Sequence, residues 1–452
     1  MSSYRMRIAL DQDDTGPSEV HLLDWRPGSS VSTVQVGKAS ARFFEGWRPP
    51  REALDLALLG AAAYCVDKVS LRRLTSDQWT RNLDLNLAVQ DAGRWADAGW
   101  SSVLSFLTGD RWAVTACHDD HDPLAAVPKV PTAVTAVGDV DAVCLFSGGL
   151  DSLCGVIDLL EGDPGLRLCL LSHHEGGQAS TAQEALRSEL FAHYGPDRLM
   201  SKRLFLRPAP ANAGQARPLP ARRENTTRAR SLLFLTTALA VAASVGPSTP
   251  VFIPENGFIG INVPLTRARS GSYSTRTTHP HFIQTFTEAA ARCGVNNPVL
   301  NPYRLTPKGQ MLAQTLNPDL LRRLAPLSVS CSHPEAARYV LRDQGNCGYC
   351  FPCLIRRASM AHVGWDSADG YAWDALDGSD LLSRPTRRAA DLRAVVNGVF
   401  DDRPDRDVLR NGPIPGGEQR AFLHVWRAGL DELRSWLHGA TGATAELIQG
   451  LQ

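Results

Sequence analysis

The chain has 452 residues, of which 43% are hydrophobic and 21% charged, and its 47 basic residues balance 47 acidic ones at a pI near 7.2. A chain of this length is expected to form about three domains, each able to bury its own core. The even charge argues against nucleic acid or an anionic membrane as a partner, and the apolar content argues against disorder.

The N-terminal segment 1–7 lacks the apolar stretch of a secretory signal. The longest apolar run, 232–245, is shorter than the ~18–20 residues of a membrane-spanning helix. We therefore expect a cytoplasmic protein whose ten cysteines are thiols or metal ligands rather than disulfides.

Residues 1–135 are predicted to form an α+β domain. Leucine alternates with polar residues at 82–87, which is typical of a half-buried strand. Further strands are expected at 5–10, 20–25, 31–36 and 112–117, helices at 51–66 and 92–107, a turn at Pro27-Gly28 and a linker at 118–137.

From residue 141 strands and helices alternate, which predicts a doubly wound parallel α/β sheet in a domain spanning 140–362. The expected strands are 143–146, 167–171, 203–206 and 251–254, and the expected helices are 151–160, 181–194 and 231–245. Residues 363–452 read as a helical extension, in which Phe422, Trp426, Leu430, Leu433 and Leu437 form one apolar helix face.

The segment Ser147-Gly148-Gly149-Leu150-Asp151-Ser152 follows the first buried strand of this domain and precedes a helix. Its glycines let backbone N–H groups approach an anion, and the helix start adds a positive dipole end. The two serines can donate hydroxyl hydrogen bonds, and Asp151 can hold Mg²⁺ or fix the loop's own amides. The alternative is an ordinary strand-to-helix turn. No Walker-type P-loop is present.

The segment 147–152 resembles the PP-loop of ATP pyrophosphatases, which cleave ATP between its α and β phosphates. That resemblance implies that all six residues contact ATP. It further implies that the end of the second strand contacts adenosine, which places Ser172 and His173 at the nucleotide.

A second motif, Cys331-x15-Cys347-x2-Cys350-x2-Cys353, supplies four thiolates with the spacing of a zinc knuckle. Gly348 allows a sharp reversal inside it, and four thiolates favour a structural Zn²⁺. Replacement of Cys331 by His333, or an iron–sulfur cluster, is the alternative. The other six cysteines are expected to be small buried hydrophobic residues, and they are Cys65, Cys117, Cys144, Cys154, Cys169 and Cys293.

A PP-loop followed by a four-cysteine zinc site resembles the QueC family, the 7-cyano-7-deazaguanine synthases. The strings 330–333 and 347–356 match that family's pattern. Two further segments, 305–311 and 230–234, resemble its lysine-containing segment and its arginine helix start. The resemblance therefore implies that Lys308 and Arg230 act in catalysis with Asp151.

The resemblance covers roughly residues 140–360, and the family's Tyr-Pro-Asp-Cys-Arg segment has no clear counterpart. Glu255 and Asn256 follow a predicted strand end and could read a guanine-like edge. His279 and His281 are candidate substrate contacts, with a turn or surface position as the alternative.

The added length resembles the enlarged QueC-like proteins of bacterial antiphage systems, such as QatC and the homologue associated with CBASS. This resemblance implies an ATP-, Mg²⁺- and Zn²⁺-dependent ligase. It would adenylate 7-carboxy-7-deazaguanine and form an amide with the N-terminal amine of a partner protein from the same defence operon. The alternatives are a synthase of the free nitrile, a PP-loop enzyme of the tRNA-thiolation type, and a nucleotide-binding scaffold without turnover.

Overall fold

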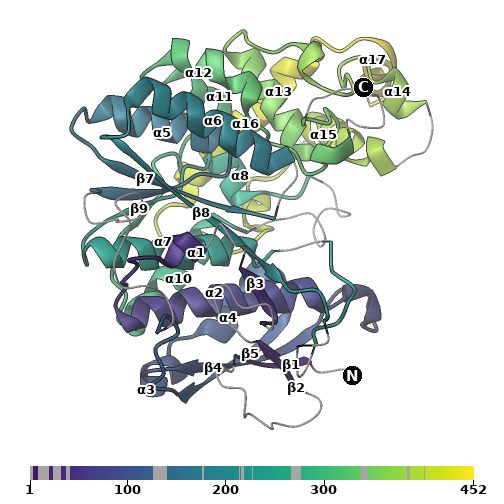
Figure 1. Ribbon diagram of the computed structural model, residues 1–452. Coiled ribbons are helices and arrows are strands. Elements are labelled where there is room, and N and C mark those ends of the chain that lie inside the picture. The colour runs from purple at the N-terminus through teal and green to yellow at the C-terminus, as the bar shows by residue number, and fades with distance from the viewer. Residues whose placement is uncertain are drawn as a thin grey trace.

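The computed structural model describes residues 4–8, 20–23, 32–36, 41–125, 140–175, 178–212, 214, 218–225, 228–265, 276–336, 345–383, 387–401 and 403–451. Two sheets form the framework, a four-stranded sheet near the N-terminus and a six-stranded central sheet (Figure 1). The expected turn at Pro27-Gly28 and most of the expected linker lie outside the described residues.

The central sheet has the strand order β10-β9-β6-β7-β8-β3 and is parallel except for β3, as expected for an α/β domain. Strand β3 comes from the N-terminal part of the chain and pairs antiparallel with β8 at the edge. The strands are β3 (Val34–Val36), β6 (Ala142–Leu145), β7 (Leu168–His174), β8 (Leu199–Pro208), β9 (Val251–Phe252) and β10 (Val299–Leu300).

Helices cover both faces of this sheet, which confirms the predicted doubly wound arrangement. Successive residues of β6 enter different cores: Val143 packs toward α7 and α2, whereas Cys144 packs toward α5 and α6. An unbroken apolar run is the pattern expected of such a doubly covered strand. The helices are α5 (Leu150–Gly162), α6 (Gln178–Tyr194), α7 (Arg230–Val245), α8 (Gly257–Ile261), α10 (Pro280–Arg292), α11 (Lys308–Ala313) and α12 (Pro318–Leu324).

The four-stranded sheet has the order β2-β1-β4-β5 and is parallel throughout. Because helices connect its later strands, the N-terminal unit is α/β, which corrects the expected α+β arrangement. In β4 Leu83, Leu85 and Leu87 are buried, as the alternation predicts. The elements are β1 (Tyr4–Ile8), β2 (Val20–Leu23), α1 (Ala41–Phe44), α2 (Arg51–Val69), β4 (Asn82–Val89), α3 (Ala92–Ala96), α4 (Trp100–Thr108) and β5 (Arg111–His118).

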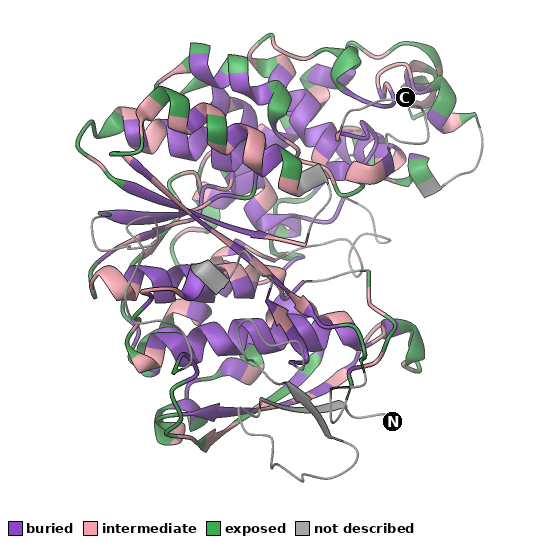
Figure 2. Ribbon diagram, viewed as in Figure 1, coloured by how far each residue is buried: buried purple, intermediate pink, exposed green. Residues whose placement is uncertain are grey.

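Helix α2 lies between the two sheets and packs against both α7 and β4 (Figure 1). Its residues are buried except Arg51, Glu52 and Lys68, so the helix is covered on all sides (Figure 2). An Ala/Leu-rich sequence suits this position, because a helix enclosed by protein needs no polar face. The N-terminal unit and the central sheet therefore share one hydrophobic core.

The C-terminal helices form a second shared core with the cysteine segment and α8. Helix α16 carries the predicted apolar face, and Phe422, Trp426 and Leu433 on it are buried. The remaining helices are α13 (Phe351–His362), α14 (Ser379–Leu382), α15 (Ala390–Phe400), α16 (Gln419–Leu437) and α17 (Gly442–Gln449). Hydrophobic contacts thus cross both of the domain boundaries expected from the sequence, the one near residues 135–140 and the one near residues 362–363.

Candidate functional site

The order of the central sheet reverses at β6, because the chain runs outward through β7 and β8 and then returns to β9 on the other side. In open parallel sheets such a switch point leaves a crevice at the carboxyl ends of the strands, where ligands bind. A cavity of about 240 Å³ lies here. It is lined by Leu145, Ser147, Ser152, Arg228, Arg230, Ser231, Phe234, Leu235, Ile253, Pro254, Glu255, Thr277 and Thr278.

The predicted phosphate loop connects β6 to α5 at the edge of this cavity. Gly148 has φ +80°, and a Cβ there would lie 2.9 Å from Cγ of Gln183, so a larger residue would be both strained and crowded. Within the loop, the Gly149 N–H donates to Ser147 Oγ at 3.3 Å. Ser152 Oγ donates to the Gly149 carbonyl at 3.0 Å and lies 3.2 Å from Ser147 Oγ. Two hydroxyls and the first turn of α5 therefore face one small space.

Asp151 points to the protein beneath the loop rather than to the cavity. Its Oδ1 lies 2.6 Å from Lys308 Nζ, and its Oδ2 accepts from Asn256 Nδ2 at 2.6 Å and from the Asn256 N–H at 3.2 Å. Burial alone would raise the pKa of Asp151, but the Lys308 charge and the Asn256 bonds outweigh it and lower that pKa. The three residues, all predicted site residues, form one buried cluster.

Asn256 therefore serves a different purpose from the predicted reading of a substrate edge. Its side chain is fully buried, its Oδ1 caps α8 by accepting from the Ile259 N–H at 3.0 Å, and its Nδ2 holds Asp151. Both ends of the amide are used within the protein. Glu255, in contrast, lines the cavity, and its contact with a guanine-like edge stays a prediction. Burial and the neighbouring Asp151 charge raise the pKa of Glu255 well above its ordinary value, so it keeps its proton to a higher pH than a surface glutamate.

Arg230 begins α7 and lines the same cavity as Glu255. Its Nε donates to His173 Nδ1 at 3.2 Å and its Nη2 to the His173 carbonyl at 3.0 Å. The other imidazole nitrogen, Nε2, lies 2.8 Å from the Leu206 carbonyl and donates to it. Burial, with the Arg230 charge, lowers the pKa of His173 to about 3, which keeps the ring neutral and able to accept from Arg230.

The two residues predicted to contact adenosine are thus buried beside the site. His173 positions Arg230, and Ser172 Oγ donates to the Phe146 carbonyl at 2.7 Å. Neither is among the residues that line the cavity.

Arg228 is a cavity residue that the sequence interpretation missed. Its Nη1 donates to the Thr108 carbonyl at 3.0 Å, and burial lowers its pKa to about 10, so it is charged at neutral pH. Its backbone N–H and that of Ala229 donate to Asp67 Oδ2 at 2.7 and 2.9 Å. A second arginine two positions before Arg230 was visible in the sequence, but its orientation depends on this contact from α2.

His279 and His281 lie outside the cavity lining. His279 is fully buried at the N-cap of α10, where its Nδ1 accepts from the His281 N–H at 3.3 Å. Both rings pack edge-on against Phe106, with centroid distances of 5.3 and 4.8 Å. Burial lowers the pKa of His279 to about 3. This arrangement corresponds to the alternative of a turn position.

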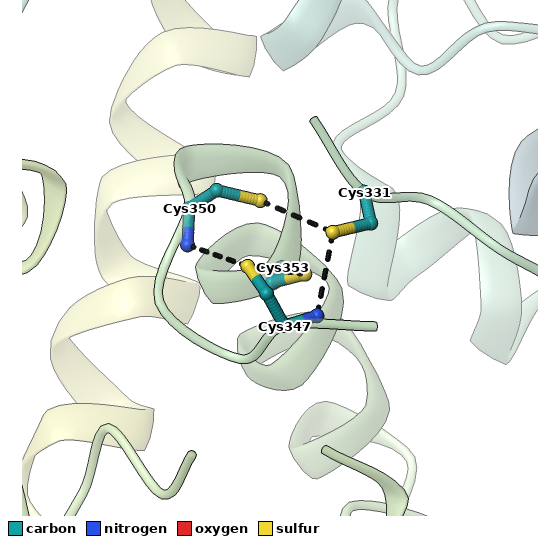
Figure 3. Close-up of side chains that lie close together, drawn as sticks. All are labelled: Cys331, Cys347, Cys350 and Cys353. Carbon is teal, nitrogen blue, oxygen red and sulfur yellow. Dashed lines mark hydrogen bonds between the residues drawn. The ribbon is translucent and has the colours of Figure 1, made fainter. Parts of the chain in front are cut away.

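The four predicted metal-binding cysteines converge, with all four sulfur atoms within 4.8 Å of one another (Figure 3). Cys331 enters from a separate stretch of chain, Cys347 and Cys350 lie on a tight loop, and Cys353 lies in the first turn of α13. The loop reverses at Gly348, which has φ +86° and where a Cβ would lie 2.1 Å from the Trp373 carbonyl oxygen. The predicted need for glycine is confirmed.

The sulfur spacing fits a single zinc ion. Tetrahedral Zn²⁺ with Zn–S bonds of about 2.3 Å separates its sulfurs by about 3.8 Å. The Cys331–Cys350 and Cys347–Cys353 sulfur distances are 3.8 and 3.9 Å. Several irons and sulfides between the thiolates would hold them farther apart. His333 is exposed and is not part of the group, so the four cysteines could hold zinc without it.

The five buried cysteines outside the cluster are not activated thiols. Five of the six are buried, and burial raises their pKa values, to about 12 in Cys65 and Cys169 and about 11 in Cys293. None of the six is among the residues that line the switch-point cavity. The expected role as small buried hydrophobic residues is confirmed for all but the partly exposed Cys117.

Within the described part of the chain, no helix combines the length and apolar character needed to cross a lipid bilayer. No known protein family model, curated protein or solved structure matches the chain.

Proposed function

We propose that the protein is an adenylate-forming, ATP-dependent C–N ligase that acts on the carboxylate of a 7-deazaguanine. The observation that carries this proposal is the cavity at the β6/β9 switch point. It combines the hydroxyls of the phosphate loop, two arginines and a glutamate with a raised pKa within one lining. The chemical class follows from this combination, whereas the deazaguanine rests on the QueC resemblance.

The cavity suits a negatively charged ligand with an apolar body. Ser147, Ser152 and the N-terminus of α5 offer hydrogen-bond donors and a positive dipole end to phosphate oxygens. Arg228, just before α7, and Arg230, its first residue, supply two cations, and Phe234 and Leu235 add an apolar surface. With about 240 Å³, the cavity is smaller than the roughly 300–1,000 Å³ of typical ligand pockets. An occupant as large as ATP would therefore extend beyond it.

In the proposed reaction an oxygen of the substrate carboxylate attacks the α-phosphorus of ATP, and the bond to the β-phosphate oxygen breaks to release pyrophosphate. The resulting acyl adenylate has AMP as its leaving group. An amine nitrogen then attacks the carbonyl carbon, loses a proton and expels AMP, which leaves an amide. Charge that develops on pyrophosphate and on AMP is stabilised by the fixed arginines, since preorganised cations act without reorganising.

In this proposal Lys308 and Asp151 stabilise the phosphate loop through contacts in the protein interior. The Lys308–Asp151 pair is buried, and Asp151 sits in the first turn of α5, where a carboxylate is favoured by the helix dipole. The pair therefore fixes the helix start that faces the phosphates. This is a positioning role, and it differs from direct contact of Lys308 with the substrate.

Magnesium fits less well at Asp151 than the sequence suggested. Both carboxylate oxygens of Asp151 are engaged, by Lys308 and by Asn256. Mg²⁺ is usually held by one or two carboxylates together with substrate phosphates, and Glu255 is the one acidic residue in the cavity lining. Glu255 would hold the ion only after losing its proton, which its raised pKa opposes, and the ion would then supply charge neutralisation at the phosphates.

A protein amine as acceptor is supported by the resemblance to the enlarged defence proteins. The tRNA-thiolation alternative needs an activated cysteine, and the buried cysteines with raised pKa values do not favour it. The nitrile synthase alternative is left to the experiment.

The test is to incubate the purified protein with 7-carboxy-7-deazaguanine and ATP, with either ammonium or the partner protein encoded beside it as the amine. Release of AMP and pyrophosphate together, and a mass increase on the partner, support the proposal. If a free nitrile forms from ammonium and the partner protein gains no mass, the protein is a nitrile synthase and a protein acceptor is excluded. Absence of AMP and pyrophosphate under every condition would contradict the enzyme proposal.

A variant pair ties that activity to the cavity. Arg230→Ala removes a cavity cation and is expected to lower kcat/KM at least 100-fold, as removal of one preorganised charge-stabilising donor typically does. Arg322→Ala on α12 removes an exposed arginine and serves as the matched control. Equal activity of the two variants would show that the chemistry takes place elsewhere.

A further inference from the structure

The phosphate loop and the four-cysteine cluster, two motifs far apart in the sequence, are joined by a short segment. Residues 328–331, here called the strap, run from the end of the 3-10 turn Ala325–Leu327 that follows α12 to the first cysteine ligand. We propose that the cysteine cluster, loaded with its metal, uses the strap to orient the phosphate loop, with Ser330 as the positioning residue. The ligand named for the loop rests on the proposed function, whereas the coupling between cluster and loop rests on the contacts below.

The strap makes two hydrogen bonds to the loop. The Val329 N–H donates to the Gly148 carbonyl at 3.0 Å. The Leu150 N–H donates to Ser330 Oγ at 3.1 Å, across 180 positions of sequence. A Cβ on Gly149 would lie 3.2 Å from Ser330 Oγ, so the strap also fills the space behind the second glycine.

The first bond decides which way a loop peptide faces. In a planar trans peptide the carbonyl and the next N–H point in opposite directions. Because Val329 holds the Gly148 carbonyl, the Gly149 N–H is turned away from the strap and toward Ser147 Oγ, which lines the cavity. A glycine pair without this anchor has broad conformational freedom and would present its amides to an anion only part of the time.

The second bond fixes the start of α5. Leu150 is the first residue of the helix, and its N–H has no partner within the helix. Ser330 Oγ supplies an acceptor from the side of the strap, which leaves the loop hydroxyls on the other side for a ligand. The strap is thus hydrogen-bonded to the loop and does not only touch it in van der Waals contact.

On its other edge the strap is held by residues that belong to the cysteine segment. Asn346, next to Cys347, accepts from the Ser330 N–H at 3.2 Å and donates to the Ser328 carbonyl at 3.2 Å. Arg356, one turn after Cys353 on α13, donates to Ser328 Oγ and to the Ala325 carbonyl, each at 2.7 Å. The strap itself ends in Cys331, whose sulfur points into the cluster (Figure 3).

One ion bound to four sulfurs would therefore hold together all three stretches of chain that fix the strap. If metal loading raises the affinity of the loop for a nucleotide, a bound nucleotide must raise the affinity for the metal by the same factor.

The first experiment measures hydrogen exchange of the Gly149 and Leu150 amides by NMR or mass spectrometry in the full-length, metal-loaded protein. Ser330→Ala removes the acceptor for Leu150 while keeping all four cysteines, and it should speed exchange of these amides about 10-fold, as expected for loss of one hydrogen bond. Ser332→Ala, on the other side of Cys331, is the matched control and should leave them unchanged. Equal exchange in both variants, with zinc content equal by elemental analysis, would overturn the proposal.

The second experiment measures binding of pyrophosphate and of a non-hydrolysable ATP analogue by calorimetry. Ser330→Ala should weaken both about 10-fold, and the same analogue should slow zinc loss to a chelator from the wild type but not from the variant. If the analogue binds neither protein, the proposed ATP site is wrong, and the exchange experiment still decides the coupling. If it binds both equally and leaves zinc loss unchanged, the coupling is wrong and the ATP site stands.

Discussion

The N-terminal unit and the C-terminal helices each supply one buried carboxylate to the start of a helix that carries a cation of the site. Asp67 on α2 accepts from the Arg228 and Ala229 N–H groups at the start of α7. Glu432 on α16 accepts from the Gly309 and Gln310 N–H groups at the start of α11, at 2.9 and 3.1 Å. A carboxylate satisfies free amides and complements the helix dipole in both places.

The two carboxylates differ in their surroundings. Asp67 lies in a cluster of alternating charges: Arg81 contacts it at 2.6 Å and also contacts Asp110, which in turn pairs with Arg72 at 2.9 Å. Glu432 is held by backbone amides, and burial raises its pKa above the ordinary value. The side of the site that carries Arg228 and Arg230 is therefore fixed by a carboxylate with arginine partners, whereas the side that carries Lys308 is fixed by a carboxylate whose hydrogen bonds come from backbone amides and whose pKa is raised by burial.

The largest effect is expected from Asp67→Asn. This change keeps the shape of the side chain but leaves the buried Arg81 with one fewer negative partner, and breaking a buried charge pair typically costs about 3–5 kcal/mol. The free energy of unfolding, measured by urea titration, should fall by that amount. Asp97→Asn, at an exposed position, is the control. If the free energy of unfolding fell by less than about 1 kcal/mol, the charged cluster around Asp67 would not distinguish the Arg228 side of the site from the Lys308 side.

A second test uses pH, because acid should act on the two sides with opposite sign. The pKa of His173 is lowered from 6.5 to about 3 in the folded protein. The unfolded chain therefore binds more protons between these values, and the stability that this group contributes is present above pH 6.5 and lost as pH falls toward 3. The expected slope is roughly 1 kcal/mol per pH unit.

His173→Gln should reduce the slope of the protein by this amount, since glutamine does not titrate, while buried His279 with its lowered pKa keeps its own contribution. The measurement is the free energy of unfolding at several pH values from 7 to 4, for the wild type and the variant. His438→Gln, at an exposed position on the C-terminal side, should retain the slope of the wild type. An unchanged slope in the His173 variant would show that the neutral ring is not what holds Arg230.

The sequence predicted the parts of this site that depend on neighbours in the chain. An apolar run, two glycines and a helix start define the loop at 147–152. The spacing of the four cysteines is visible in the sequence itself. The parallel sheet followed from alternating strands and helices. These features are local, and their physical causes act over a few residues.

The contacts that orient the side chains of the site could not be predicted from neighbouring residues in the sequence. Asp67 reaches Arg228 across 161 positions and Glu432 reaches Gly309 across 123. Asn256 was expected to face the substrate because it follows a strand end, but it turns inward to Asp151. The N-terminal region and the C-terminal helices each supply a carboxylate to the start of a helix of the site, which the sequence alone does not indicate. Long-range pairing of this kind leaves no periodic pattern in a single sequence.

The smallest change in the free energy of unfolding is expected from Glu432→Gln. The pH dependence of this change is the most informative part of the measurement. Glutamine keeps one acceptor oxygen for two amides, so a loss of about 1 kcal/mol is expected near pH 5. The raised pKa means that folded Glu432 binds more protons than the unfolded chain, so the stability it contributes is full below pH 4.5 and is lost as pH rises through the folded value. The cost of the substitution should therefore shrink toward pH 8, measured against Glu446→Gln at an exposed position. A cost that grew with pH would show that the Glu432 charge is compensated like that of Asp67, and the distinction between the two sides of the site would be lost.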